Sequence, residues 1–140
     1  MIKTKTLVCK SLSDDMSGVK LVETQIEEPK DNEVLIKVKA ASVNFPDLLM
    51  TQGKYQHKPE LPFGLGMEGS GIVQSVGSEV SRIKEGDEVT FGALGKGAFT
   101  EFIYVNQNSV EIKPSNLNFE QAAAFQTAYL TAYVSLVRRG

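Results

Sequence analysis

The feature that most constrains the fold is a two-residue hydrophobic period that recurs along most of the chain. Apolar residues alternate with polar ones through 34–40 and again through 99–105, as in strands that bury one face. The segments between such runs, for example 28–32 and 84–87, are turn-rich and too short for the crossover helices of a parallel sheet. We therefore expect an antiparallel barrel or sandwich. Its strands are expected near 4–10, 18–27, 33–42, 68–76, 88–93, 98–105 and 109–113.

Two helical segments accompany these strands. Pro46 suits a first helical position, Asp47 complements the helix dipole, and Gly53 can end the helix in a left-handed conformation, which predicts a short helix over 46–52. A second helical region begins after Asn118, whose side chain can cap the free amides that follow, and it continues to the last residue. This region carries apolar side chains that normally pack on another part of a protein: Leu130, Tyr133, Val134 and Val137.

The stretch PFGLGMEGSGIV at residues 62–73 contains a G-x-G-x-x-G pattern at Gly64, Gly66 and Gly69. In a dinucleotide-binding loop, a buried strand leads into the glycines and a helix follows them, so that helix amides face the pyrophosphate. Here prolines precede the glycines, and a run typical of a strand follows them. We expect a glycine-rich strand start that passes close to other backbone, and no dinucleotide site at this position.

Composition excludes several classes of function. The net charge is −2 and the basic residues are scattered, which argues against nucleic-acid binding. No stretch approaches the length of a membrane span, and the N-terminus lacks the apolar core of a signal peptide. Cys9 is the single cysteine, so an internal disulfide is excluded and a reducing compartment is indicated. We expect a cytoplasmic protein with neither a nucleic-acid nor a membrane partner.

Six motifs follow one another in a recognisable order: ASVNFPD at 41–47, GKY at 53–55, PFGLGMEGSGIV at 62–73, GDEV at 86–89, GAFTE at 97–101 and FEQAAA at 119–124. In this order they resemble the N-terminal, catalytic half of medium-chain dehydrogenases/reductases, in the zinc-independent quinone oxidoreductase (zeta-crystallin-like) branch. The resemblance implies a mainly β fold, a GroES-like antiparallel β-barrel with a short helix near 46–52 and C-terminal helical segments from about 118. It also implies that residues 1–125 form the acceptor-binding domain. Residues 126–140 would then begin the helix that connects to a Rossmann NADPH-binding domain absent from this chain.

The positions that bind zinc in the alcohol dehydrogenases of this superfamily carry different residues here. A zinc-binding histidine aligns with Met67, and a zinc-binding cysteine aligns with Asn44. A thioether and an amide are poor zinc ligands. The hydroxyl that relays protons in those enzymes aligns with Pro46, which has no side-chain donor. With one cysteine and one histidine, His57, in the whole chain, we expect no metal site.

What the resemblance implies about function is hydride transfer from NADPH to a quinone or another α,β-unsaturated carbonyl without a metal, as in an NADPH:quinone oxidoreductase. Such an acceptor develops its charge on an oxygen that hydrogen bonds can stabilise. The complete protein is expected to be a homodimer, and this chain alone is expected to be inactive. Two alternatives remain open: a free-standing GroES-like barrel that acts as a non-catalytic binding module, and half of an enoyl-thioester reductase.

Three residues match the family's site positions, and each has a simpler alternative. Asn44 matches a catalytic and cofactor-binding position near the nicotinamide and acceptor, but it can also merely close a turn before the first helix. Tyr55 matches a catalytic aromatic of the acceptor pocket, whose hydroxyl can donate a proton, but it can also be a rim residue. Thr131 matches a cofactor-binding position beside the nicotinamide, but it can also bond to its own helix backbone.

Neighbouring residues are interpreted more simply. Met67 is expected to fill a gap in the core. Glu68 is either a buried, paired carboxylate near the cleft or a surface residue at a strand start. His57 lies in a polar loop and is expected to be solvated.

Overall fold

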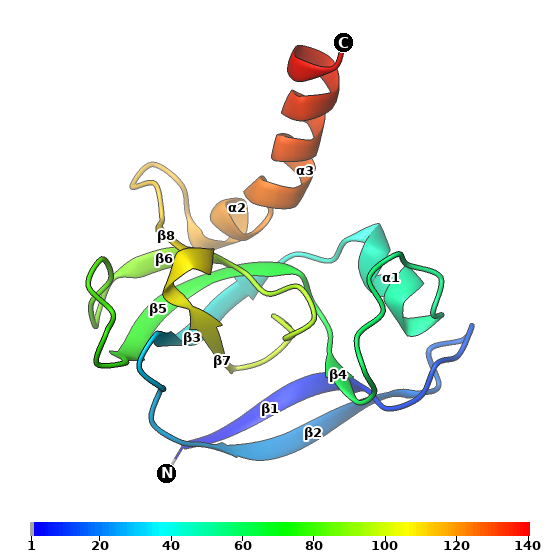
Figure 1. Ribbon diagram of the computed structural model, residues 1–140, viewed down its shortest axis with the longest axis horizontal. Helices are drawn as coiled ribbons and strands as arrows, with labels where there is room; N and C mark the ends of the chain where they lie inside the picture. The colour runs from blue at the N-terminus through cyan, green and yellow to red at the C-terminus, as the bar shows by residue number, and fades with distance from the viewer. Residues whose placement is uncertain (1) are drawn as a thin grey trace.

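The structure, a computed structural model, describes residues 2–140 and contains two antiparallel sheets (Figure 1). One sheet has the strand order β2-β1-β4 and the other β7-β3-β5-β6-β8. The strands are β1 (Ile2–Cys9), β2 (Val19–Ile26), β3 (Glu33–Ala41), β4 (Phe63–Gly64), β5 (Glu68–Val76), β6 (Glu88–Gly92), β7 (Phe102–Asn106) and β8 (Val110–Ile112). The helices are α1 (Phe45–Thr51), the 3-10 turn η1 (Gln107–Ser109), α2 (Phe119–Ala123), α3 (Phe125–Tyr133) and the π-helical turn η2 (Val134–Arg138). The expected mainly β, antiparallel architecture is confirmed.

Most expected elements lie within two residues of their predicted bounds, and one strand departs further. β7 begins at Phe102, so the predicted start at 98 is wrong. The preceding residues instead join the two sheets: the N–H of Leu7 donates to the carbonyl oxygen of Phe99 at 2.9 Å, and Thr100 forms an isolated bridge with Thr6. The alternation at 98–101 therefore reflects a crossing between the sheets.

Two apolar clusters form the core. The larger belongs mainly to the five-stranded sheet, with members that include Val34, Ile36, Val73, Val89, Phe91 and Val105. The smaller contains Cys9, Met50, Phe63 and Leu65, with Tyr55 and Met67 packed against it. Met50 comes from α1, so this cluster attaches the short helix to the sheet of β1 and β4.

The glycine-rich stretch leads into a strand, as predicted. A Cβ atom at Gly64 would lie 2.1 Å from the carbonyl oxygen of Lys96. At Gly69 it would lie 2.6 Å from a ring carbon of Phe91 and 2.9 Å from the carbonyl oxygen of Ala40. These glycines are required because neighbouring groups pass too close for any side chain. The segment that follows is β5 and not a helix, so the geometry of a dinucleotide-binding loop is absent here.

The C-terminal helices begin at the predicted cap, where Asn118 Oδ1 accepts the N–H of Gln121 at 2.8 Å. The helical region is not continuous, because α2 ends at Ala123 and α3 starts at Phe125, with Ala124 as a turn residue between them. In Figure 1, α3 projects from the body of the molecule on the side away from the β1–β2 pair. The expected apolar side chains of α3 and of the following η2 are exposed: Leu130 by 60%, Tyr133 by 52%, Val134 by 42% and Val137 by 61%. Across residues 2–140, none of the helices combines the length and the apolar character needed to cross a bilayer.

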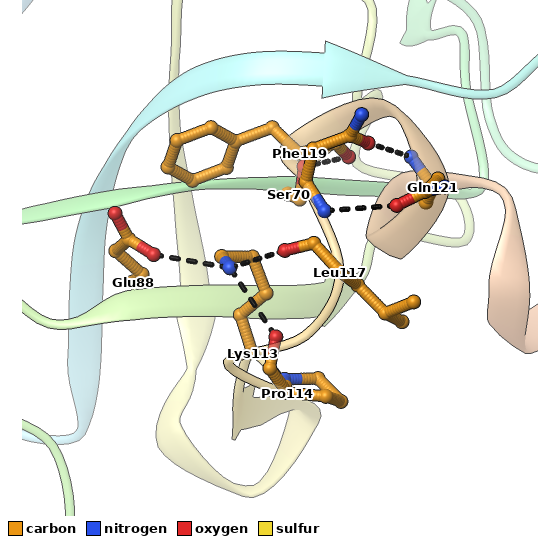
Figure 2. Close-up of polar contacts among 8 residues, drawn as sticks. Ser70, Glu88, Lys113, Pro114, Leu117, Phe119 and Gln121 are labelled. Carbon is orange, nitrogen blue, oxygen red and sulfur yellow. Dashed lines mark hydrogen bonds and ion pairs between the residues drawn. The ribbon is translucent and has the colours of Figure 1, made fainter.

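Lys113 holds the loop between β8 and α2 in place (Figure 2). Its ammonium group donates to the carbonyl oxygens of Leu117 at 2.6 Å and Pro114 at 3.3 Å. It also pairs with Glu88 Oε2 at 3.1 Å and lies 5.4 Å from the centroid of the Phe119 ring. A buried cation requires such partners, and together they fix the path of the chain into α2.

Candidate functional site

The carboxylate of Glu68 organises a polar cluster beside α1 and α3. Glu68 is the first residue of β5 and is only 3% exposed. Its Oε1 accepts hydrogen bonds from Ser42 Oγ at 2.5 Å and from Asn44 Nδ2 at 3.1 Å. Its Oε2 accepts the backbone N–H of Thr127 at 2.9 Å. Of the two expectations for Glu68, the buried carboxylate is confirmed, and its partners are neutral hydrogen-bond donors.

Asn44 is fixed at the start of α1, where the turn role predicted for it is observed. It is the N-cap residue of α1, and its backbone N–H donates to Asp47 Oδ2 at 2.8 Å. Its side-chain nitrogen donates to Ser42 Oγ at 3.0 Å as well as to Glu68. The two acceptors are themselves only 2.5 Å apart, so they lie in a similar direction from the nitrogen and share one of its two hydrogens. Asn44 is therefore held from its backbone and from its side chain at once.

Asp47 is a second buried carboxylate at this site, with 5% exposure. Its Oδ1 accepts the N–H of Gly66 at 3.2 Å, so it joins the start of α1 to the segment before β5. Burial raises the pKa of Asp47, and the nearby charge of Glu68 raises it further, while the hydrogen bonds from Asn44 and Gly66 oppose the increase. The sequence suggested only a helix-dipole role for Asp47. Its place three residues after the N-cap is the signal that indicates the hydrogen bond to Asn44.

The other two predicted site residues lie outside the Glu68 cluster. Tyr55 is half-buried and packs against the smaller apolar cluster. Thr131 is exposed on α3 and lines an open cavity of about 430 Å³. The rest of that wall comes from the same helical segment: Gln126, Thr127, Leu130, Val134 and Ser135. Thr127 belongs both to this α3 cavity and to the Glu68 cluster, so the structure connects Asn44 with the surface that carries Thr131.

The residues at the aligned zinc positions do not form a metal-binding donor set. The amide of Asn44 directs an N–H group at Glu68 and Ser42, and Met67 packs against the smaller apolar cluster as expected of a gap-filler. His57 is exposed. Within the described part of the chain, no group of three or more His, Cys, Asp or Glu side chains is placed to hold a metal ion.

Comparison with known proteins gives a consistent result. The family model of the alcohol dehydrogenase GroES-like domain matches residues 30–115. The quinone oxidoreductase of Sus scrofa is 38% identical over 115 residues, which cover 82% of this chain and 35% of that protein. The chain thus spans about a third of the length of the curated relatives that it matches.

Solved structures agree with the fold. The human synaptic vesicle membrane protein VAT-1 homolog-like protein superposes with a TM-score of 0.88 at 31% identity, over 99% of this chain and 44% of that one. The Escherichia coli quinone oxidoreductase complexed with NADPH gives a TM-score of 0.81 at 33% identity, over 97% of this chain and 41% of that one.

Proposed function

The chain belongs to the alcohol dehydrogenase GroES-like domain family, and from this premise we propose that it is the acceptor-binding part of a metal-free, NADPH-dependent oxidoreductase. The proposed reaction is hydride transfer to a quinone or another α,β-unsaturated carbonyl. The observation that carries the proposal is the placement of Asn44, whose amide is held by Glu68 next to the α3 cavity. The names of the relatives support the class of reaction.

The proposal assigns different functions to different parts of the complete protein. Residues 1–125 would form the acceptor-binding domain, and residues 126–140 would begin the connection to a Rossmann domain that binds most of the NADPH. Two observations support this division. The relatives are about three times as long as the matched segment, and α3 exposes apolar side chains of the kind that a packed domain covers.

Each of the three predicted site residues would have a separate role in the reaction. Bound NADPH would supply the hydride, which leaves the protein to position the reactants and to stabilise charge on the acceptor oxygen. Because Glu68 and Ser42 hold one side-chain N–H of Asn44 and thereby fix its amide, Asn44 would orient the reactants, while another group donates to the acceptor oxygen. The hydroxyl of Tyr55 is the donor that we propose for it. Thr131, on the α3 cavity wall, would contact the nicotinamide side.

The proposed chemistry needs no Lewis acid. Hydride addition to a conjugated acceptor delocalises the developing charge onto oxygen, where hydrogen bonds can stabilise it. This suits a site whose two aligned zinc positions carry Asn44 and Met67, neither of which is a good zinc ligand.

We also propose a cytoplasmic location and a homodimer for the complete protein. The single cysteine, Cys9, which allows no internal disulfide, supports a reducing compartment. The homodimer rests on the family resemblance alone.

The test is the oxidation of NADPH by a soluble quinone in the presence of a metal chelator. The 140-residue chain is compared with the gene product extended beyond Gly140. We expect chelator-resistant turnover from the extended protein and none from the short chain. Turnover that the chelator abolishes would contradict the metal-free reaction, and the lack of turnover with every quinone and enone would contradict the reaction class.

A further inference from the structure

We propose that Glu68 is a positioning residue that couples the side chain of Asn44 to the start of α3, and thereby to the wall of the α3 cavity. The catalytic consequence of this coupling rests on the proposed function. The coupling itself is a property of the chain as described, so it can be tested without cofactor, acceptor or turnover.

The first step of the argument is that α3 has no N-cap of its own. The N-cap position is Ala124, whose side chain has no acceptor and whose backbone is helical, with φ −90° and ψ −2°. The N–H groups in the first turn of a helix have no partners inside the helix and need external acceptors. For Thr127 that acceptor is Glu68 Oε2, at 2.9 Å and 59 residues earlier in the chain. A carboxylate at this end of a helix is also favoured by the helix dipole.

The second step concerns the other oxygen of the same carboxylate. Oε1 accepts from Asn44 Nδ2 and from Ser42 Oγ. Both oxygens belong to one planar group that is almost completely buried. Water therefore has little access with which to replace either set of hydrogen bonds. The separation between the amide of Asn44 and the first turn of α3 is set by a single side chain.

The third step links this first turn to the cavity wall. Thr127 and Thr131 are four residues apart on α3, so they lie on the same face of the helix, and both line the α3 cavity. A movement of Glu68 would displace the amide of Asn44 and this wall together. In the proposed enzyme, both of these groups face the reactants.

Carboxylate chemistry makes the coupling sensitive to a near-isosteric change. An ionised carboxylate only accepts hydrogen bonds, and here every partner is a donor. In a Glu68→Gln variant, one oxygen would become an NH₂ group that faces donors. Glutamine can direct its one oxygen at only one side, so the hydrogen bond from Thr127 is either lost or made to a neutral and therefore weaker acceptor.

The first measurement compares the NMR chemical shifts of the wild-type chain with those of a Glu68→Asp variant, which keeps the carboxylate but shortens the side chain by one methylene. The backbone N–H of Thr127 and the side-chain NH₂ of Asn44 should both change chemical shift, because both donate to Glu68. An unchanged chemical shift at either group would overturn the proposal.

The second measurement is amide hydrogen exchange in the Glu68→Gln variant, with Ser42→Ala as the matched control. Ser42 bonds to the same carboxylate but makes no hydrogen bond to α3. We expect exchange at Thr127 to be about tenfold faster or more in Glu68→Gln and unchanged in Ser42→Ala. Exchange at Val73, whose N–H donates to the backbone carbonyl oxygen of Asp87 within the barrel, should stay as in the wild type.

The outcomes separate positioning from a general structural role. An unchanged Thr127 in Glu68→Gln would overturn the proposal, and so would an equal acceleration at Val73 and Thr127. If Glu68→Gln does not fold, the Glu68→Asp variant, which keeps the charge, decides the question. Neither measurement involves hydride transfer, so a failure here is distinct from a failure of the proposed reaction.

Discussion

Replacement of Lys113 by methionine tests how the loop before α2 is held (Figure 2). The change removes the ammonium group and keeps an unbranched side chain of similar length. The side chain of Lys113 is 5% exposed, whereas that of its ion-pair partner Glu88 is 54% exposed. The strongest contact is therefore the buried one, from Nζ to the carbonyl oxygen of Leu117 at 2.6 Å.

The magnitude follows from these contacts. A hydrogen bond from a charged donor contributes about 1.5–3 kcal/mol, and its loss leaves the carbonyl of Leu117 without its donor. The half-exposed pair with Glu88 is screened by solvent and adds no more than about 1 kcal/mol. We expect Lys113→Met to lower the free energy of unfolding by about 2–4 kcal/mol. Glu88→Gln, which removes only the exposed partner's charge, should cost about 1 kcal/mol or less.

The assay is urea unfolding followed by circular dichroism, with the wild type, Lys113→Met and Glu88→Gln measured together. Equal slopes against urea concentration would show that the free energies can be compared directly. A cost of Glu88→Gln equal to or above that of Lys113→Met would refute the reasoning, because the ion pair would then be the dominant contact. A cost of Lys113→Met below about 1 kcal/mol would show that the carbonyl contacts do not stabilise the loop.

Three further predictions concern other parts of the chain. Burial raises the pKa of Asp47, so the folded state favours the protonated carboxyl group. This contribution to the free energy of unfolding is fully present below the ordinary pKa and is lost as the pH rises through the raised pKa. The free energy of unfolding of Asp47→Asn minus that of the wild type, measured by urea unfolding, should therefore increase from about pH 4 to pH 7. A decrease over this range would contradict the raised pKa of Asp47. Gly69→Ala should lower stability by about 1–3 kcal/mol in thermal unfolding, since its Cβ would lie 2.6 Å from a ring carbon; Gly92→Ala, with open space around it, is the control. In the extended protein, Tyr55→Phe should reduce kcat for quinone reduction about a hundredfold and leave the affinity for NADPH unchanged. Asn44→Ala should reduce kcat and also weaken NADPH binding. A kcat of Tyr55→Phe equal to that of the wild type would contradict the donor role of Tyr55.

Much of the fold could be predicted because its evidence is local. The strands are marked by a two-residue period, and the short helix is bounded by Pro46 and by Gly53, which has the predicted positive φ of 68°. The start of β7 could not be predicted in this way. Thr100 bonds to Thr6, 94 residues away, and a contact between two sheets leaves no periodic signal in the residues beside it.

In the candidate site, too, the features with local evidence could be predicted and those that depend on remote contacts could not. Asn44 was identified through motif order, and its capping role follows from the residues just after it. The partners of Glu68 are remote, with Ser42 separated by 26 residues and Thr127 by 59. Nothing in the residues near Thr127 indicates that its N–H meets a carboxylate. Such a network becomes visible only when strand and helix are placed together.

The interruption between α2 and α3 also depends on residues that are remote in the sequence. Ala124 has the strongest intrinsic preference for helix, so the local sequence provides no reason for an interruption there. Glu68 and Ser70, two residues apart on β5, point to one face of the sheet. Ser70 Oγ donates to the carbonyl oxygen of Phe119 at 2.6 Å, and Glu68 accepts the N–H of Thr127.

These two anchors are about 6.6 Å apart along the strand. Thr127 follows Phe119 by eight positions, which would place it about 12 Å further along an uninterrupted α-helix. A continuous helix would carry Thr127 away from Glu68, whereas a turn at Ala124 brings its N–H back to the carboxylate. The direction of α3, and with it the position of Thr131, is thus set by two side chains of β5, which explains why a helix-favouring sequence is interrupted at this residue.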